Sequence, residues 1–387
     1  MYFRKGGRLA GSALQIAFDG RVIRAGKSGV GVYAESLLSA LSSIDKKSAY
    51  KVLSHGVFKS LSRNFSSVQT NVSIESHPFG DLWEQFYLPA YLKGNKVDVF
   101  HSPTFHIPFV SGRFKKVVTI HDLVSFRTPQ TQPRGFTLYS RFMTRFASLS
   151  ADAIIVPSRT VKSELVGLLN VSPEVLHVIP EAPRGMFRPA SRAECESVKR
   201  KYGLSGSFIL TVGSIEPRKN IPSLIRAYSL LRQRGKTRHK LVICGAKGWM
   251  REHERIQRLI GDLEIGSDVV FTGYVPDEDL PAMYTLADLF VYPSLYEGFG
   301  LPPLEAMACG CPVVASNCSA IPGVVGDAGV LVEPMDADGI SEAMQSVMED
   351  EGLKRRLRAA GFARAREFSW EKTARETLKT YMAVMER

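Results

Sequence analysis

The sequence predicts an α/β protein made of two doubly wound domains, in which helices cover both faces of a parallel sheet. Short apolar runs typical of buried strands alternate with longer amphipathic segments typical of helices. The alternation stops in the proline-rich segment 178–190 and then starts again. A chain of 387 residues is also long enough for two domains of ordinary size.

The first half contains four candidate strands, each of which ends in a polar or turn-forming residue. They cover residues 14–19, 97–102, 116–122 and 151–158. The helices expected between them run from about Val30 to Ser43, over 134–150 and over 159–169.

The second half repeats the pattern with six candidate strands, at 208–214, 240–245, 268–273, 288–294, 312–316 and 329–334. The expected helices between them cover 221–235, 249–264, 279–287, 301–309 and 336–350. Six such strands fill one doubly wound domain, so we expect domains over 1–185 and 186–368 and a closing helix over 369–387. Its apolar stripe is predicted to contain Trp370, Ala374, Leu378 and Met382.

The net charge of +12 is confined to the first half of the chain. Residues 1–190 hold 24 Lys and Arg against 12 Asp and Glu, whereas residues 191–387 hold 26 of each. This asymmetry indicates that the two halves meet different partners. Apolar residues make up 44% and charged residues 23%, which is ordinary for a folded protein and excludes a disordered chain or a disulfide scaffold.

No apolar run in the sequence approaches the ~18 residues that a membrane-spanning helix needs. Gln15 interrupts the first apolar stretch, so we interpret the basic residues before it as a short leader and not as part of a signal peptide. These residues are Arg4, Lys5 and Arg8.

All five cysteines follow residue 190. Cys309, Cys311 and Cys318 lie close together, but they lack the paired C-x2-C units that zinc sites usually use. We therefore expect buried thiols in a reducing compartment and no metal site.

The segment 296–316 is the clearest candidate site. Glu297 follows the strand 288–294, and Glu305 lies one turn into the next helix. The segment therefore offers two carboxylates that can accept hydrogen bonds from hydroxyl groups of a ligand. Glycines permit close backbone approach to a ligand, and the amides that open the helix can bind an anion. Together these features suit a nucleotide sugar. The backbone concerned belongs to Gly298, Phe299, Gly300 and Leu301.

A second candidate segment, 212–228, carries Arg218 and Lys219 after the strand 208–214. Two adjacent cations at the carboxyl end of a strand can neutralise a diphosphate, Arg with a fork and Lys with a point charge. In the first half, Gly29 and Gly31 form a glycine loop before a helix, which is weak evidence for phosphate binding.

Together these motifs resemble family 4 of the retaining glycosyltransferases, which have the GT-B fold. The resemblance extends from about residue 14 to 380. The motifs are E-x7-E at Glu297–Glu305, the GSIEPRKN loop, TGYVPDEDLPAMYTLADLFVYPS (272–294), the GVGVY loop, HD at 121–122 and PSRTVKSEL (157–165).

In that family the second domain binds the nucleotide sugar. The resemblance implies that Arg218 and Lys219 contact the diphosphate, that Glu305 binds the ribose and that Glu297 binds hydroxyls of the donor sugar. It places His121 at the donor sugar from the first domain, across a central cleft between the two crevices. The remaining implied donor contacts are Gly29, Gly31, Gly213, Tyr274, Val275, Gly298, Phe299, Gly300 and Leu301.

The chain departs from the family at one position. Many relatives carry Asn-Gly after the IP of the interdomain strand, where this chain has Glu181 and Ala182. The sequence assigns Glu181 no role. The resemblance further implies that the terminal helix crosses back to the first domain.

The resemblance implies a retaining transfer that needs no metal or cofactor, because Arg218, Lys219 and the helix amides stabilise the leaving diphosphate. The sequence has one D-x-D, and we expect its Asp336 to be a helix N-cap. A bacterial polysaccharide mannosyltransferase that uses GDP-mannose and a glycan or polyprenyl-diphosphate acceptor fits best. A GT-B epimerase or sugar phosphorylase is the alternative enzyme, and a nucleic-acid-binding protein is disfavoured because no such motif is present.

The basic half is then the acceptor side, and we expect it to rest on the anionic inner face of the cytoplasmic membrane. A generally basic surface is the simpler alternative. The residues proposed for the membrane face are Lys46, Lys47, Lys51, Lys59, Arg63, Arg134, Arg141 and Arg145.

Overall fold

The computed structural model describes residues 13–23, 29–55, 61–70, 72, 82–110, 112–248 and 251–387. The basic leader, Lys59 and the part of the glycine loop before Gly29 lie outside these residues. The chain forms two compact units. Unit 1 comprises Met1–Leu123, Tyr139–Glu181 and Trp370–Arg387, and unit 2 comprises Val124–Leu138 and Ala182–Ser369.

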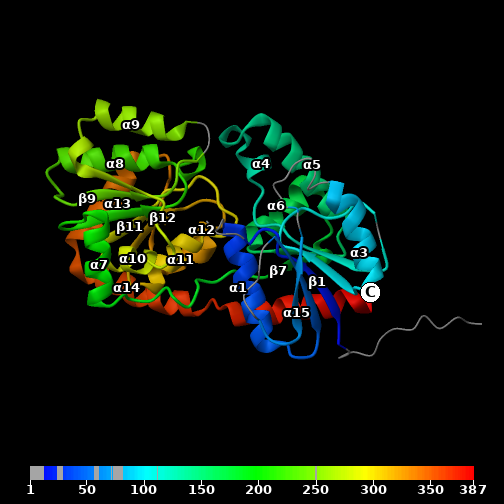
Figure 1. Cartoon of the computed structure of the whole chain (residues 1–387). Helices are drawn as coiled ribbons and strands as arrows, with labels where there is room; N and C mark the ends of the chain where they lie inside the picture. The colour runs from blue at the N-terminus through cyan, green and yellow to red at the C-terminus, as the bar shows by residue number, and fades with distance from the viewer. Residues whose placement is uncertain are drawn as a thin grey trace, which may run out of the picture. The chain divides into compact units, whose positions relative to one another are not determined.

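Unit 1 contains a seven-stranded parallel sheet in the order β3-β2-β1-β4-β5-β6-β7 (Figure 1). The four predicted strands correspond to four of these, and the three outer strands β2, β3 and β7 were not predicted. The strands are β1 (Gln15–Asp19), β2 (Ala49–Ser54), β3 (Phe65–Gln69), β4 (Val99–Ser102), β5 (Lys115–Thr119), β6 (Ala153–Val156) and β7 (Leu176–Val178).

The helices of this half begin and end close to the predicted positions. The predictions for 134–150 and 159–169 agree with α5 and α6 to the residue. Ser158 caps α6 by accepting a hydrogen bond from the amide of Val161. The helical segments are α1 (Gly29–Ile44), η1 (Trp83–Tyr87), α3 (Leu88–Gly94), α4 (Val124–Arg127), η2 (Pro129–Thr131), α5 (Arg134–Ser150), α6 (Arg159–Leu169) and η3 (Pro173–Val175).

The last helix, α15 (Trp370–Glu386), packs against α1 in unit 1. The predicted apolar stripe of this helix is confirmed in part: Ala374 is buried in the core and Trp370 and Leu378 pack against it, but Met382 is 40% exposed. The buried face contains Thr373, Ala374, Thr377, Thr380, Tyr381 and Val384. Threonine hydroxyls bond helix carbonyls, as Thr377 does to Thr373, so these side chains can enter a core that a simple apolar count assigns elsewhere.

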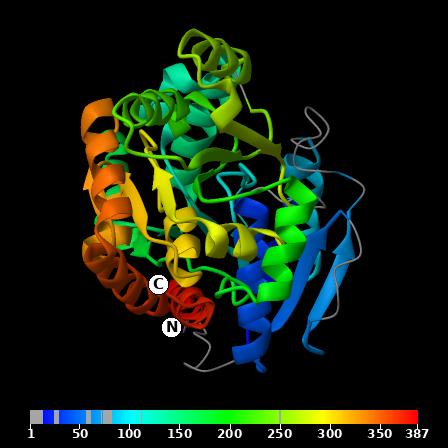
Figure 2. The same ribbon diagram turned by 90° about the vertical axis from the view of Figure 1, so that its left-hand side faces the viewer.

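Unit 2 contains a six-stranded parallel sheet in the order β10-β9-β8-β11-β12-β13, which confirms the six predicted strands. Helices α10, α11 and α12 cover one face of this sheet and α8, α9 and α13 cover the other (Figures 1 and 2). A hydrophobic cluster lies under each set. The strands are β8 (Phe208–Val212), β9 (Lys240–Cys244), β10 (Val269–Gly273), β11 (Leu289–Tyr292), β12 (Val313–Ser316) and β13 (Val330–Val332).

The helices of unit 2 connect these strands in sequence. Asp336 caps α13 by accepting a hydrogen bond from the amide of Gly339 at 3.0 Å, as predicted. The helical segments are α7 (Arg192–Tyr202), η4 (Pro217–Lys219), α8 (Ile221–Gln233), α9 (Glu252–Asp262), η5 (Gly266–Asp268), α10 (Leu280–Leu286), α11 (Leu301–Ala308), α12 (Ile321–Val325), η6 (Gly326–Ala328), α13 (Ala337–Glu349) and α14 (Glu351–Arg366). No helix among the described residues is long and apolar enough to cross a membrane.

Candidate functional site

The sheet topology of unit 2 brings the two predicted donor segments together. The strand order reverses between β8 and β11, and ligands of doubly wound sheets bind beyond the carboxyl ends of the strands at such a point. The loop after β8 carries Arg218 and Lys219, and the loop after β11 carries Glu297.

Glu297 lies at the centre of a compact ionic cluster. Its carboxylate contacts the Lys219 ammonium and the Arg218 guanidinium, each at an N–O distance of 2.7 Å. The hydroxyls of Tyr292 and Ser294 donate to Oε1 of the same carboxylate at 2.8 and 2.7 Å. The tyrosine hydroxyl also accepts a hydrogen bond from Lys219 at 2.7 Å. This side-chain arrangement fixes both cations at the strand ends.

Backbone contacts hold the two loops together around this cluster. Arg218 donates from Nη1 to the Tyr296 carbonyl at 2.9 Å, and the amide of Leu295 donates to the Arg218 carbonyl at 2.9 Å. Gly213, with φ +152°, allows the Lys219 side chain to pass, since an added Cβ would lie 3.3 Å from Lys219 Cε. The cations are therefore held by the fold, as a preorganised anion site requires.

The cluster is largely shielded from water and nearly balanced in charge. The side chains of Arg218, Lys219 and Glu297 are only 12–16% exposed. Burial would raise the pKa of Glu297, but the adjacent cations outweigh it and hold that pKa well below its usual range. Burial and the neighbouring Arg218 lower the pKa of Lys219, against the opposing effect of Glu297. Glu216 lies 3.6 Å from Arg218 and adds a second carboxylate.

Glu305 occupies a different environment on α11. It is 9% exposed and accepts a hydrogen bond from the Tyr284 hydroxyl at 3.2 Å. Burial raises the pKa of Glu305 to about 7, against the lowering effects of Arg184 and of the Tyr284 hydrogen bond. Arg184 itself pairs with Asp277 at 2.7 Å. This carboxyl group is therefore poised between its two protonation states near neutral pH.

The other predicted donor residues of unit 2 differ in exposure. Phe299 is buried and its ring packs edge-on against Phe368 at 5.7 Å. Gly300, with φ +124°, precedes the helix that begins at Leu301, and an added Cβ would lie 2.8 Å from Ile321. Gly298 is buried in the same loop. Two further residues follow β10: Tyr274, which is 54% exposed, and Val275, which is buried.

In unit 1, His121 lies just after β5 and contacts Glu181. The Nδ1–Oε1 distance is 2.8 Å, and Nε2 lies 3.1 Å from the Pro103 carbonyl oxygen. Gly29 and Gly31 lie in the first turn of α1 and not in a loop before it. An added Cβ at Gly29 would meet no atom within 4 Å, so packing does not require glycine there.

Several residues of these clusters were not identified from the sequence. Tyr292 is the last residue of β11, and Ser294 follows two residues later. Their hydroxyls could have been predicted as site residues, because ligands bind at the carboxyl ends of such strands. Tyr284 lies on α10 and contacts Glu305 only through the tertiary fold. The sequence assigns Glu181 no role, because its partner His121 lies 60 residues away in the chain.

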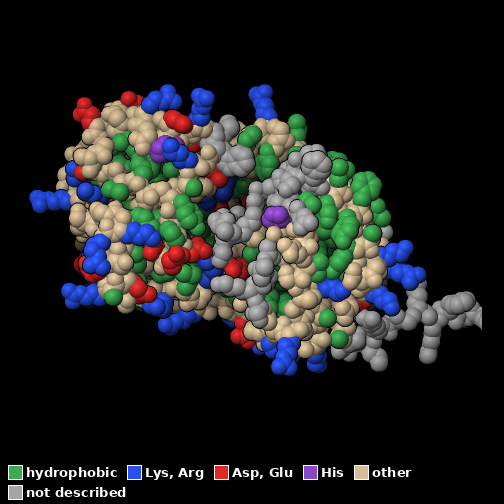
Figure 3. All heavy atoms as spheres, viewed as in Figure 1, with side chains coloured by type: hydrophobic (Ala, Val, Ile, Leu, Met, Phe, Trp, Pro, Cys, Tyr) green, Lys and Arg blue, Asp and Glu red, His purple; other side chains and the backbone are tan. Residues whose placement is uncertain are grey.

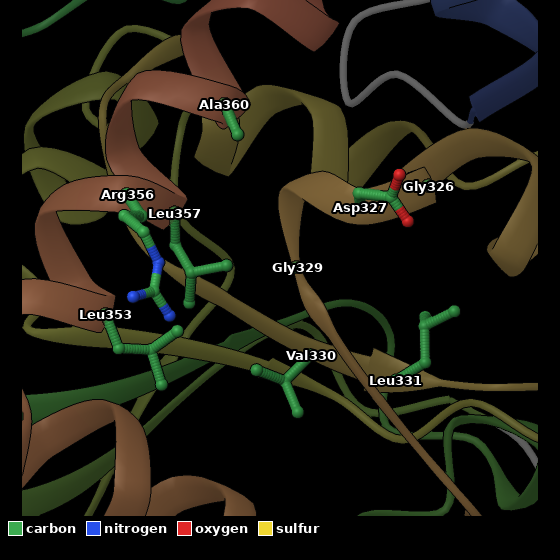
Figure 4. Close-up of a pocket in the computed structure, with 9 residues that line it drawn as sticks. All are labelled: Gly326, Asp327, Gly329, Val330, Leu331, Leu353, Arg356, Leu357 and Ala360. Atoms are coloured by element: carbon green, nitrogen blue, oxygen red, sulfur yellow. The ribbon is translucent and has the colours of Figure 1, made fainter.

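A separate pocket of about 510 Å³ lies between α14 and the edge of the six-stranded sheet (Figure 4). Its charged lining residues are Asp327 and Arg356, and it contains none of the predicted site residues. Among the described residues, no group of three or more His, Cys, Asp or Glu side chains is placed to hold a metal ion. The five cysteines form no disulfide, and Cys309 and Cys311 are buried.

Comparison with known proteins supports a single family. Residues 27–182 match the family model described as Glycosyltransferase Family 4, and residues 197–364 match that of Glycosyl transferases group 1. The chain is 34% identical to O-antigen chain mannosyltransferase B of Escherichia coli over 354 residues, and this match covers 90% of this chain and 89% of the relative. It is also 34% identical over 304 residues to the serotype-specific mannosyltransferase WbdA of Escherichia coli, covering 78% of this chain but 37% of WbdA.

Several solved structures have a similar fold. Sucrose-phosphate synthase from Thermosynechococcus elongatus superposes with a TM-score of 0.78 at 22% identity, covering 96% of this chain and 99% of that one. Anabaena HepE in complex with UDP and glucose gives 0.73 at 19%, covering 95% and 99%. WaaG, a glycosyltransferase involved in lipopolysaccharide biosynthesis, gives 0.74 at 16%, covering 94% and 98%. The fold is GT-B, and the chain is a glycosyltransferase that belongs to family 4.

Proposed function

We propose that this protein is a retaining hexosyltransferase that uses a nucleotide-diphosphate sugar, with GDP-mannose as the donor. The acceptor is a glycan or a polyprenyl-diphosphate-linked glycan in polysaccharide or lipopolysaccharide biosynthesis. The observation that carries the proposal is the Arg218–Lys219–Glu297 cluster at the switch point of unit 2. The names of the mannosyltransferase relatives, and the UDP-sugar complex of HepE, support the substrate class.

In this proposal the two cations receive the diphosphate of the donor. Arg218 offers a planar fork and Lys219 a point charge, and both suit phosphate oxygens. The amides of Phe299, Gly300 and Leu301 at the start of α11 add further donors to the same anion.

The other residues bind the nucleoside and the sugar. Glu297 accepts hydrogen bonds from hydroxyls of the donor sugar, and Glu305 accepts those of the ribose. Tyr274 and Val275 line the base site, and Gly213 admits the ligand close to the backbone. From unit 1, His121 contacts the donor sugar and the α1 glycines approach the phosphates.

The proposed reaction breaks the bond between the anomeric carbon and the diphosphate oxygen and forms a bond from that carbon to the acceptor oxygen. The electron pair of the broken bond leaves with the diphosphate, where Arg218 and Lys219 balance the developing charge. The acceptor enters on the face from which the diphosphate leaves, and its hydroxyl proton passes to a diphosphate oxygen. Because protein cations supply the balancing charge, we expect transfer to persist in EDTA.

A thermal-shift panel of UDP-, GDP- and dTDP-sugars tests the donor, because a ligand that binds only the folded state raises its apparent stability. We expect the largest shift with GDP-mannose. Lys219→Ala and Glu305→Ala should each reduce turnover at least ~10²-fold, the scale of losing one preorganised contact. Near-normal turnover in both variants would disprove the site assignment. The exposed Glu342→Gln on α13 is the matched control.

Two assays separate the proposed mechanism from its alternatives. The first assay uses a slowly reacting donor. If a glycosyl group is then found covalently attached to Glu297, the reaction proceeds by double displacement and not by same-face transfer. Incubation with the donor alone should leave it unchanged, whereas a nucleotide-sugar epimerase would convert it without an acceptor. A sugar phosphorylase would instead require inorganic phosphate. Gel shifts with nucleic acid at physiological salt should show no complex.

We further propose that unit 1 rests on the anionic cytoplasmic face of the membrane. The outer side of α5 presents Phe142, Arg145 and Leu149, spaced so that they share one helix face. Phe142 and Leu149 are 62% and 72% exposed. Phe109, itself 45% exposed, packs edge-on against Phe142 at 6.4 Å and extends this apolar surface. In the view of Figure 3, hydrophobic side chains gather on the outer surface of unit 1. An apolar face beside arginines suits the interface of an anionic bilayer.

The basic residues expected on the membrane face lie in two places. Arg141 and Arg145 lie on the part of α5 that belongs to unit 1, and Arg134 lies on its first turn, which belongs to unit 2. Lys46, Lys47, Lys51 and Arg63 lie at or near the beginnings of β2 and β3. Sedimentation with anionic vesicles at low salt tests the α5 face. Phe142→Gln with Leu149→Gln should abolish binding, and Leu168→Gln on α6, which is 41% exposed, should not. Failure of the wild-type protein to sediment would remove this proposal.

A further inference from the structure

The carboxylate of Glu181 lies within hydrogen-bond distance of His121, the histidine that the sequence singled out in unit 1. The two side chains are 8% and 17% exposed, and the Nδ1–Oε1 distance is 2.8 Å. The other ring nitrogen, Nε2, lies 3.1 Å from the backbone carbonyl oxygen of Pro103. Both nitrogens of one imidazole therefore face oxygen acceptors.

This geometry restricts the protonation of the ring. A neutral imidazole has one N–H donor and one bare nitrogen. If Nε2 were bare, its lone pair would face the Pro103 carbonyl oxygen; if Nδ1 were bare, it would face the Glu181 carboxylate. Two N–H donors satisfy both contacts, and a histidine ordinarily holds a proton more strongly than a glutamate does. We infer that Glu181 is a positioning residue that holds His121 as an imidazolium in a fixed orientation.

The packing around the pair supports this role. The segment that carries Glu181 is held by α15, where the Thr373 hydroxyl donates to the Pro180 carbonyl at 2.7 Å. The ring of Tyr33 on α1 packs edge-on against His121, with 4.6 Å between ring centroids. The position that departs from the family pattern thus supplies a direct partner for the candidate histidine.

The charged and titratable groups around His121 have opposing effects. Burial lowers the pKa of His121, but Glu181 and Asp122, the residue after His121, raise it, and the net pKa is raised. Tyr33 lies beside the ring, and burial keeps its phenol protonated by raising its pKa. His101 on β4 is the nearby second imidazole, and burial lowers its pKa to about 3, so it adds no competing positive charge at neutral pH. Glu181 is the carboxylate in direct contact.

Nitrogen-15 NMR of the histidines in the full chain, from pH 5.5 to 8.5, tests the inference without any substrate. We expect both ring nitrogens of wild-type His121 to stay protonated to a higher pH than in an ordinary histidine, whose pKa is about 6.5. In Glu181→Gln the midpoint should fall by about 1–3 pH units, the effect of losing an adjacent opposite charge. Asp122→Asn also removes one negative charge near His121, but Asp122 is not the partner of Nδ1, so this variant should lower the midpoint less.

The conservative variant Glu181→Asp should restore part of the shift, and it carries the test if Glu181→Gln does not fold. A wild-type midpoint at or below the ordinary histidine value of about 6.5, or equal midpoints in wild type and variants, would overturn the inference. Its consequence for transfer rests on the proposed function: as pH rises, donor kcat/KM should begin to fall at a lower pH in Glu181→Gln than in the wild type. Absence of transfer with every donor, with the NMR shift present, would refute the proposed function alone.

Discussion

Replacing Glu297 by glutamine tests the ionic cluster most directly, because the side chain keeps its shape and loses its charge. In the wild type, Oε1 accepts hydrogen bonds from Lys219, Tyr292 and Ser294, and Oε2 contacts Arg218. The glutamine amide has one oxygen, which accepts hydrogen bonds, and one NH2 group, which donates them. Whichever way the amide is turned, its NH2 group faces either Arg218 or Lys219, which are themselves donors. We expect Glu297→Gln to leave two poorly compensated positive charges near the surface of unit 2.

The magnitude follows from the burial of the cluster. Removing one partner of a fully buried ion pair costs about 3–5 kcal/mol, and the 12–16% exposure of these side chains places this variant near the lower end. A loss of about 3 kcal/mol lowers Tm by about 6–12 °C for a unit of this size. Glu342→Gln, an exposed site on α13, should change stability by less than about 0.5 kcal/mol.

The same variant should bind inorganic diphosphate more tightly than the wild type, although it loses turnover. In the wild type, Glu297 competes with an incoming anion for both cations, and the variant removes that competition. Saturation at about 100 times Kd would restore about 2.7 kcal/mol to the variant. Thermal unfolding with and without diphosphate measures both effects. A Tm equal to that of Glu342→Gln, or no gain in diphosphate binding, would refute the assignment of the cluster as an anion site.

Three other predictions use stability as the measurement. As pH rises from 4.5 to 8, the stability of Glu305→Gln relative to the wild type should increase by up to about 3 kcal/mol, because the folded wild type, with a Glu305 pKa of about 7, holds this proton more tightly than the unfolded chain does. Denaturant midpoints of both proteins measure this difference, in which titrations common to both, such as that of His101, cancel. Tyr292→Phe should cost about 1–3 kcal/mol by removing the hydroxyl between Lys219 and Glu297, and an unchanged urea midpoint would contradict this. Gly300→Ala should cost about 1–3 kcal/mol because of its φ of +124°, whereas Gly167→Ala on α6, where a Cβ meets open space, should not destabilise.

The sequence predicted all six strands of unit 2 and the four central strands of unit 1, because each of these strands is a short run of mostly apolar residues. The outer strands β2, β3 and β7 escaped this criterion. β3, with the sequence FSSVQ, contains no fully buried residue, and β7 has only three residues, so neither shows the continuous apolar run of a buried strand. They form because their backbones pair with stronger neighbouring strands, which a local pattern does not contain.

The same distinction applies to the site. Arg218, Lys219 and Glu297 were predicted together because each follows a strand that ends at the same edge of one sheet. The partners Tyr284 and Glu181 escaped prediction because their contacts to Glu305 and His121 depend on how a helix and a connecting segment pack. The basic residues of the first half were treated as one face, but the fold divides them between α5 and the beginnings of two strands.

The two glutamates of the E-x7-E motif show what tertiary packing adds to spacing. Both are carboxyl groups of one loop and helix, yet their pKa values shift in opposite directions. Cations beside Glu297 hold its pKa well below the usual range and keep it ionised, whereas burial raises the pKa of Glu305 to about 7, so that this carboxyl group is partly protonated near neutral pH. Strongly perturbed groups of this kind are typical of functional sites. Glu305 therefore gives the proposed donor site a pH dependence: binding of the ribose hydroxyls by an ionised Glu305 should strengthen as pH rises through 7, and Glu305→Gln should remove that dependence.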